Sequence, residues 1–562
     1  VTGSYVNNQQ HYKEFRKEII YNPNKKSNPN QLDERFYGWE RGTFDALLNY
    51  DKQFDVHGLK AMAGYHLEKY NYRENQSIRK NFPTNDLDDM NAGDAATQTN
   101  SGYTRELAMI SWFARLNYDY SGKYLFEANI RADASSRFSD GNRWGYFPSF
   151  SAAWRISEEN FMESSRDWLD NLKIRTSWGL LGNQNALSDY YPWLNTYQLD
   201  GKYNFGSGLK TGYYLDSYKL STISWEKACT WGIGVDASFF NCVDLSVDFY
   251  DRKTTGIIMD VPVPKEFGLK PYKDNVGEML NRGVEVTLGY HKKWGKWTLG
   301  ATGNFAYNKN ELLDLGGVDY MVDPGDKYKR RQIGERLNSY YAYKTNGFFQ
   351  SDEEAQAWMD KYSKLPGYPF GTRKFKGGDL IYQDTDGVEG ITENDRVLLG
   401  SMDPAWTFGL NLNAGYKGWD ISMMFSGAAN VSRMFTNPGD FNGDMARPTT
   451  LWLDAWTPDN KNAEMPRVAY DKTSPSHPWN AMSDFWIQDA SYLRLQNLQV
   501  GYTFSTKCLK ALHVENLRMY YSAENLFTID NMMVNVDPES RDTNGNGYPL
   551  LQTHSIGVSL TF

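Results

Sequence analysis

The chain has 562 residues, and its 60 Lys and Arg residues against 69 Asp and Glu residues give a net charge of -9. This acidic balance argues against a nucleic-acid-binding protein, which would normally present a basic face. No run of residues approaches the roughly 18 consecutive apolar positions that a transmembrane helix needs. A transmembrane β-barrel stays open, because its strands alternate polar and apolar residues, and aromatic residues make up 15% of this chain.

Alternation with a period of two residues runs along most of the sequence. Apolar residues Phe126, Ala128, Ile130 and Ala132 alternate with polar residues Glu127, Asn129, Arg131 and Asp133. The same pattern recurs over residues 408–416, 498–504 and 556–562. Successive side chains of a strand point to opposite faces, so each segment predicts a strand with one apolar and one polar face. The expected strands are long and begin or end in aromatic residues, which is typical of membrane-interface girdles.

The predicted connections between strands alternate in length. Short turns are expected at residues 121–123, 240–242, 293–296 and 417–418, and long polar loops at about residues 73–102, 183–223, 255–275, 311–337 and 435–484. Short periplasmic turns and long extracellular loops describe an outer-membrane barrel. About sixteen strands fit between Val1 and Phe562, which agrees with an even count.

Residues 338–350 fit no membrane crossing and are expected in an extracellular excursion. Ser351 and Glu354 then form a capping box, which predicts a short helix over residues 352–361.

Two structural alternatives remain open at this point. An antiparallel sheet of a water-soluble protein also alternates, with its polar face in water. A sixteen-stranded barrel could close by itself as a porin, or further strands could precede Val1, since an open sheet edge is costly in lipid.

Residues 483–498, which read Ser-Asp-Phe-Trp-Ile-Gln-Asp-Ala-Ser-Tyr-Leu-Arg-Leu-Gln-Asn-Leu, resemble the late-barrel signature of the SusC/RagA family. These are TonB-dependent outer-membrane transporters of Bacteroidetes. Residues 456–460, 517–527 and 536–539 are also similar to this family. The resemblance implies an all-β, up-and-down transmembrane barrel of 22 strands with an N-terminal plug. Residues 1–562 would then be one outer-membrane barrel domain, the C-terminal part of that barrel, with the plug, the TonB box and the first strands absent.

The resemblance also implies a function in transport. Family members import nutrients across the outer membrane of Gram-negative bacteria by TonB-dependent active transport, here an oligosaccharide (glycan) or a peptide. A SusD-like surface lipoprotein covers the loops, and the two-protein complex is expected to form a dimer whose barrels contact outer-membrane lipid. The aromatic Phe562 resembles the last residue that the barrel-assembly machinery recognises, and would serve equally as a lipid-facing ring.

Other functions compete with this interpretation. A siderophore or cobalamin receptor would share the architecture, whereas a passive porin or surface adhesin would act without TonB. A soluble glycan-binding protein or glycosidase would need, for hydrolysis, two carboxylates flanking a cleft. We find no HExxH, Walker or nucleophile-elbow motif, so an enzyme is not expected.

Two loops carry clusters of aromatic residues that could stack on a ligand or dock the lipoprotein. The first cluster is Tyr190, Tyr191, Trp193 and Tyr197, and the second is Trp452, Trp456, Trp479 and Trp486. The alternative role is girdle anchoring or packing of the loops against each other, because aromatic residues are abundant at both places in such barrels.

One loop contains part of a calcium-binding pattern. Asp384, Asp386 and Asp395 occupy the first, third and twelfth places of an EF-type loop, but Val388 and Glu389 stand where Asp and Gly would be expected. The sequence therefore gives a weak expectation of Ca²⁺ and no expectation of another cofactor, and an acidic turn without metal is the alternative.

Overall fold

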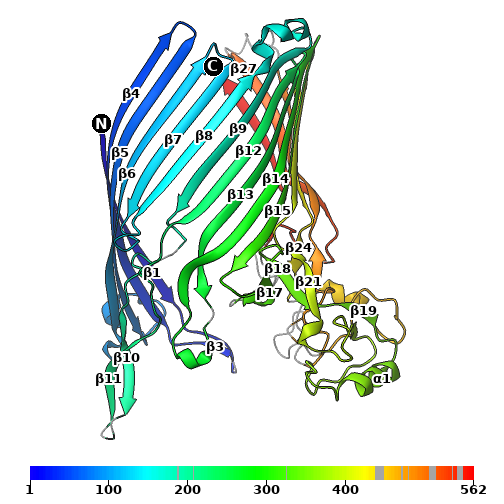
Figure 1. Cartoon of the computed structure of the whole chain (residues 1–562). Helices are drawn as coiled ribbons and strands as arrows, with labels where there is room; N and C mark the ends of the chain where they lie inside the picture. Colours follow the sequence, from blue (N-terminus) through cyan, green and yellow to red (C-terminus); the bar gives the residue numbers. More distant parts are fainter. Residues whose placement is uncertain are drawn as a thin grey trace. The chain divides into compact units, whose positions relative to one another are not determined.

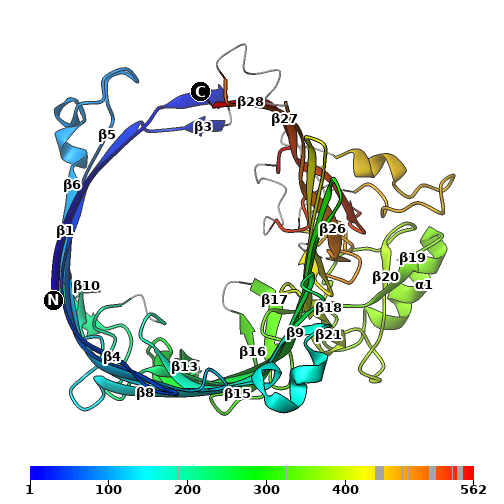
Figure 2. The same cartoon turned by 90° about the horizontal axis from the view of Figure 1, so that it is seen from above.

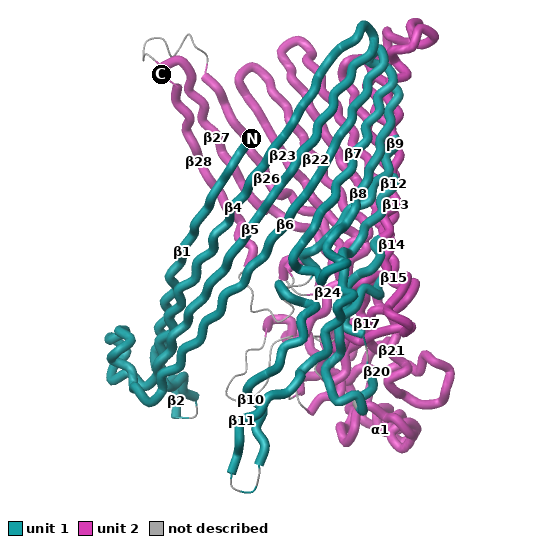
Figure 3. Tube along the Cα trace, turned by 60° about the vertical axis from the view of Figure 1, so that its left-hand side comes forward, with its two compact units in different colours: residues 1–154, 176–231, 254–277 teal, residues 155–175, 232–253, 278–562 magenta. Residues whose placement is uncertain are grey.

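The computed structural model describes residues 1–23, 25–186, 189–204, 206, 208–261, 263–323, 326–436, 449–469, 473–478, 480–504, 514–533, 536–540 and 549–561. Trp479 and Phe562 lie outside the described residues. The chain divides into two compact units, shown in Figure 3. Unit 1 comprises residues 1–154, 176–231 and 254–277, and unit 2 comprises residues 155–175, 232–253 and 278–562.

Among the described residues, sixteen strands form one sheet, as the alternation predicts (Figure 1). Their order in the sheet follows the sequence. The strands are β1 (Thr2–Arg16), β4 (Gln31–Phe54), β5 (His57–Lys80), β6 (Thr99–Tyr120), β7 (Tyr124–Ser135), β8 (Trp144–Arg155), β9 (Leu169–Asn183), β12 (Glu226–Phe239), β13 (Val243–Val261), β14 (Tyr272–Trp294), β15 (Trp297–Leu315), β22 (Trp406–Tyr416), β23 (Trp419–Ala429), β26 (Tyr492–Thr503), β27 (Asn516–Asp530) and β28 (Thr553–Thr561).

Within unit 1, antiparallel pairing keeps one face of the sheet apolar. One apolar row runs across five strands through Leu48, Ala63, Ala114, Ile130 and Pro148. Within the described part of the chain, Leu48 is 74% and Ile130 51% exposed, so these apolar side chains require an apolar surrounding. Figure 2 shows β1, β4, β5 and β6 along one curved wall of this unit.

The short turns occur where the sequence predicts them. Between β6 and β7, Ser121 and Gly122 adopt positive φ angles of 56° and 67°, which lets two antiparallel strands join directly. A further tight turn joins β4 to β5 at residues 55–56, and the sequence pattern did not reveal it.

Several loops are shorter than expected because the strands continue past the apolar belt. The predicted loop at residues 73–102 is wrong in its bounds: β5 extends to Lys80 and β6 starts at Thr99. Residues 73–80 and 99–102 are polar and therefore lack the alternation, yet β5 and β6 remain paired up to Ile78 and Thr99. Polar overhangs of these two strands thus take the place of loop.

Smaller elements decorate the loop ends. The pairs are β2 (Ile19–Asn22) with β3 (Lys25–Ser27), β10 (Tyr197–Asn204) with β11 (Leu209–Leu215), β19 (Thr345–Phe348) with β20 (Leu380–Tyr382), and β24 (Ser432–Met434) with β25 (Ile487–Asp489). A four-stranded sheet contains β16 (Tyr320–Asp323), β17 (Asp326–Gln332), β18 (Ser339–Tyr343) and β21 (Arg396–Ser401). Short 3-10 helices are η1 (Met90–Ala92), η2 (Ala95–Thr97), η3 (Ile156–Glu158), η4 (Asn160–Ser165), η5 (Lys265–Phe267), η6 (Glu393–Asp395) and η8 (Thr450–Asp454).

Residues 338–350 belong to these small sheets and not to the main one, as expected for an excursion. The predicted helix is α1 (Asp352–Tyr362). The Ser351 hydroxyl accepts a bond from the Glu354 amide at 3.2 Å, and the Glu354 carboxylate accepts one from the Gln350 amide at 2.6 Å. Among the described residues, no helix has both the length and the apolar character needed to cross a membrane.

The loops of unit 2 contain a packed core of their own, which we call the loop core. It consists of two clusters of buried side chains. The first contains Tyr328, Tyr340, Ala342, Met434, Phe435, Met465, Met482, Trp486 and Ile487, and the second contains Tyr343, Phe349, Ala355, Met359, Phe370, Phe375, Leu380, Tyr382, Ile391 and Ala481. Figure 1 places α1, β19 and β21, which contribute to or adjoin this core, together at one end of the unit.

Candidate functional site

Next to the overhangs of β5 and β6, strands β4, β5 and β6 carry a group of tyrosine and arginine side chains on the polar face of unit 1. Antiparallel register places Arg41 opposite Tyr70, and Tyr72 opposite Arg105. Because side chains two residues apart share a face, Tyr103 lies on the same side as Arg105. Together with Tyr190 from a long loop, we call Arg41, Tyr70, Tyr72, Tyr103 and Arg105 the tyrosine–arginine wall.

Tyr190 brings the loop between β9 and β12 to this wall. Its ring meets the edge of Tyr70 at a centroid distance of 6.4 Å. The guanidinium of Arg105 lies 5.6 Å from the Tyr190 ring centroid, and that of Arg137 lies 5.1 Å from it. Two cations therefore face one ring, an arrangement that cation–π attraction stabilises by about 0.5–1 kcal/mol for each exposed pair.

Tyr191 attaches the same loop to the edge of β6. β7 pairs with β6 only from Met109 onward, and Ser136 bonds the amide and carbonyl of Ala108, so β7 leaves the edge of β6 before Ala108 uncovered. The Tyr191 hydroxyl accepts a bond from the Glu106 amide at 3.1 Å and donates one to the Glu106 carbonyl at 3.3 Å. The loop is thus fixed at the point where Tyr190 reaches the wall.

The carboxylates near the wall already have partners. Glu74 accepts bonds from the hydroxyls of Tyr72 at 2.6 Å and Tyr103 at 2.9 Å. Asp189 lies 2.7 Å from the Lys219 ammonium. Burial alone would raise the pKa of Asp189, but Lys219 and the Tyr191 amide outweigh it and hold this pKa below its usual value.

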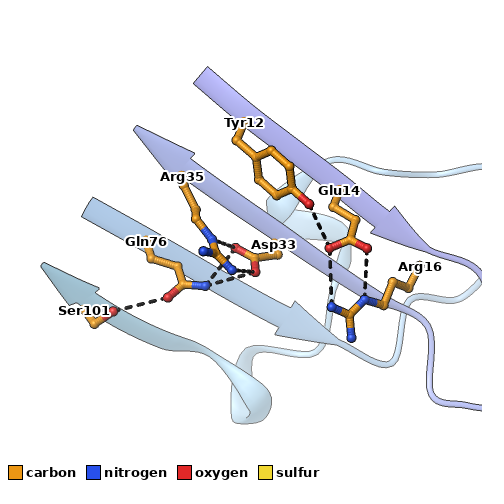
Figure 4. A network of polar contacts seen from close by, with 7 residues as sticks. All are labelled: Tyr12, Glu14, Arg16, Asp33, Arg35, Gln76 and Ser101. Carbon is orange, nitrogen blue, oxygen red and sulfur yellow. Dashed lines mark hydrogen bonds and ion pairs between the residues drawn. The ribbon is translucent and has the colours of Figure 1, made fainter. Parts of the chain in front are cut away.

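A second polar network continues along the same face toward the strand ends (Figure 4). Arg35 donates two bonds to Asp33, at 3.1 and 2.8 Å, and Gln76 donates two more at 3.0 and 2.9 Å. Asp33 is buried, so these bonds compensate for its lost hydration. Ser101, Tyr12, Glu14 and Arg16 complete the network drawn there. These charges satisfy one another and form a fixed frame.

The rest of the first predicted cluster lies elsewhere in the loop. Trp193 is partly buried. Tyr197 begins the hairpin β10–β11, is 62% exposed and meets Tyr213 edge-on at 5.5 Å. Only Tyr190 and Tyr191 of this cluster therefore reach the wall through contacts described above.

The second predicted cluster packs into the loop core. Trp486 is 1% exposed and donates its indole N–H to the Ser476 carbonyl at 2.8 Å. Trp456 is 7% exposed and covers Gly378, where a Cβ atom would approach its ring to 2.5 Å. Trp452 is partly buried against the first cluster of the loop core. This burial favours the packing role for these three rings, and Trp479 lies outside the described residues.

The three aspartates of the calcium pattern do come together. Carboxylate oxygens of Asp384, Asp386 and Asp395 lie within 4.8 Å of one another. Asp395 is fully buried, and its two oxygens accept bonds from the amides of Thr385 at 2.7 Å and Thr392 at 2.7 Å. A cation would have to share Asp395 with these amides, so the calcium expectation stays a prediction.

A buried ion pair crosslinks the loop core. Asp379 is fully buried and lies 3.0 Å from the Arg467 guanidinium. Its carboxylate also accepts bonds from the Lys376 amide at 2.8 Å and from the hydroxyls of Ser474 and Ser476, both at 3.2 Å. One side chain therefore joins residues 376–379 to Arg467, Ser474 and Ser476, which lie 88 to 97 residues beyond Asp379 along the chain.

Sequence reasoning missed Tyr70, Tyr103 and Arg105. A signal was present, since Tyr70, Tyr72 and Glu74 alternate with polar residues in strand spacing. It went unused because these residues border the predicted loop at residues 73–102, where the alternation stops.

Residues 2–526 match the family described as TonB dependent receptor-like, beta-barrel. The chain is 28% identical to the TonB-dependent receptor P3 of Formosa agariphila over 92% of its length, covering 52% of that protein. It is also 28% identical to the TonB-dependent receptor SusC of Bacteroides thetaiotaomicron, over 95% of its length and 52% of SusC.

Among solved structures, the RagAB peptide transporter matches with a TM-score of 0.80 and 25% identity, over 100% of this chain and 59% of that chain. The chain thus spans about half the length of the curated relatives it matches. These likenesses confirm the resemblance to SusC and RagA and the transmembrane antiparallel β-barrel class. The chain belongs to the TonB-dependent receptor-like β-barrel family, whose members lie in the outer membrane of Gram-negative bacteria.

Proposed function

We propose that this protein imports a nutrient across the outer membrane, driven by TonB, and that it performs no covalent chemistry on its cargo. The tyrosine–arginine wall carries this proposal. In a barrel the polar face lines the lumen, so the wall stands at the entrance of the channel. Rings, hydroxyls and guanidinium groups on a fixed sheet suit reversible capture of a polar ligand through several modest contacts. The family of the chain and the peptide transport named for RagAB support import over catalysis.

We further propose that a SusD-like surface lipoprotein covers the loops, with the hairpin β10–β11 as one docking element. The hairpin exposes large apolar side chains: Tyr197 (62%), Leu199 (75%), Leu209 (69%) and Tyr213 (71%). A two-stranded hairpin is marginally stable by itself in water. Exposed apolar surface of this kind marks protein interaction sites, so a partner that buries these rings would stabilise the hairpin.

Purification from the native outer membrane in mild detergent, followed by mass spectrometry, tests both statements. We expect a lipoprotein in near-equal amount, and we expect the double substitution Tyr197→Ala with Tyr213→Ala to reduce its recovery. Tyr21→Ala is the matched control, because Tyr21 is 59% exposed on β2, another loop element. If the protein purifies without a partner and conducts ions without TonB, the importer proposal is wrong and a porin is favoured.

A further inference from the structure

Among the described residues, Arg105 differs from Arg35 and Arg41 of the same face in having no carboxylate partner. Its guanidinium lies 4.6 Å from the ring centroid of Tyr103 and 5.6 Å from that of Tyr190. Arg35 and Arg41, on β4 two strands away, lie 2.8 and 3.9 Å from Asp33 and Glu68. Within the described ranges, no carboxylate oxygen comes within 4 Å of Arg105. Rings hold the cation in place while its N–H groups keep their capacity to donate.

Two carboxylates whose electrostatic environment includes Arg105 are bonded to other groups. Glu74 receives the hydroxyls of Tyr72 and Tyr103, and Asp189 receives Lys219. Both acids act on Arg105 only through space. Among the described residues, neither acid forms a hydrogen bond or ion pair with Arg105. The Arg105 guanidinium, on an exposed part of β6, is therefore available to bind an anionic group of a ligand.

We infer that Arg105, flanked by Tyr103 and Tyr190, binds the anionic group of an oligosaccharide, either a uronate carboxylate or a sulfate ester. This inference rests on the proposed import function and names its substrate class. A planar guanidinium donates two parallel bonds to such an oxyanion. The flanking rings offer faces to the C–H groups of a sugar, and Tyr103 is 43% exposed.

The edge of β6 favours a sugar over a peptide here. An extended peptide would bind most strongly by adding a strand to a free sheet edge. At Glu106, next to Arg105, both backbone groups on that edge are taken by the Tyr191 hydroxyl. A ligand at Arg105 must therefore be recognised through side chains, which suits a carbohydrate without a repeating amide.

Calorimetric titration of the purified transporter, in complex with any lipoprotein that accompanies it, tests this inference. Four probes of similar length serve: an oligogalacturonate, a sulfated carrageenan oligosaccharide, a neutral malto-oligosaccharide and a peptide rich in Asp and Glu. We expect Arg105→Gln to lower the affinity for one of the two charged oligosaccharides about 10- to 100-fold. A hydrogen bond to a charged group is worth about 1.5–3 kcal/mol. Arg105→Lys keeps the positive charge but loses the two parallel N–H donors of the guanidinium. Its affinity should lie between those of the unaltered protein and of Arg105→Gln.

Arg115→Gln is the matched control. Arg115 lies on the same face of β6 but bonds Asn129 at 2.7 Å, and its substitution should change affinity less than twofold. The affinity lost in Arg105→Gln should also be the part that falls with added salt.

The other outcomes overturn the inference. Equal weakening of charged and neutral oligosaccharides would make Arg105 a structural residue only. If Arg105→Gln loses binding of the acidic peptide alone, the site belongs to peptides. If the unaltered protein binds none of the probes, Arg105 is not an anion-binding site. None of these outcomes decides the import function, which the purification and conductance experiment tests separately.

Discussion

Removal of the Asp379 carboxylate should open the loop core while the main sheet stays intact. The substitution Asp379→Ala leaves the Arg467 guanidinium without its partner and withdraws acceptors from Ser474, Ser476 and the Lys376 amide. Breaking a buried pair by removing one partner costs about 3–5 kcal/mol. The Arg467 side chain keeps 20% exposure and can hydrate in part, so we take the lower end, about 3 kcal/mol.

That free energy corresponds to a more than hundredfold rise in local opening, at about 1.4 kcal/mol for each factor of ten. Hydrogen exchange measured by mass spectrometry on the detergent-solubilised protein should show faster exchange at residues 376–382 and 473–478. Asp360→Ala removes an exposed carboxylate of α1 and serves as the control. Unchanged exchange in Asp379→Ala would refute the crosslinking role, and faster exchange throughout β26 and β27 would show that the effect is not local.

Three further perturbations have definite expected results. Tyr191→Phe removes both bonds to Glu106, so exchange of the Glu106 amide should rise several-fold, and an unchanged rate would contradict the anchoring role. Burial raises the pKa of Tyr343 and of Tyr368 to about 12. The folded loop core therefore holds these protons more tightly than the unfolded chain. Its stability should fall by about 2 kcal/mol through Tyr343 as the pH rises from 10 to 12, with tyrosinate absorbance rising upon unfolding. Because amides occupy Asp395, calcium titration should give a dissociation constant no tighter than about 10⁻⁴ M, which a micromolar value would contradict.

The main sheet could be predicted because its signal is local. Lipid contact imposes a two-residue period, as in residues 126–133, and a short turn such as residues 121–123 marks each reversal. The α1 helix was predictable for the same reason, since Ser351 and Glu354 lie three residues apart. Outside the bilayer the period loses its cause, so the overhangs of β5 and β6 read as loop.

The composition of the wall could not be predicted, because it depends on contacts between distant residues. Tyr190 meets Tyr70 and Arg105, which precede it by 120 and 85 residues. Local pattern selected Tyr190 as an aromatic loop residue but gave no partner for it. For the tryptophans, the local pattern suggested a role that the contacts do not favour. A loop rich in aromatic residues suggested ligand stacking, whereas Trp456 and Trp486 are buried.

The placement of Tyr103 and Arg105 on a strand has a consequence for the thermodynamics of capture. Their backbone is fixed by the ladder between β5 and β6, and their side chains already stack on each other before a ligand arrives. Ordering a mobile side chain on binding costs about 0.5–1.5 kcal/mol, and here most of that entropy is lost during folding. A ligand would meet a surface that is already in its binding conformation.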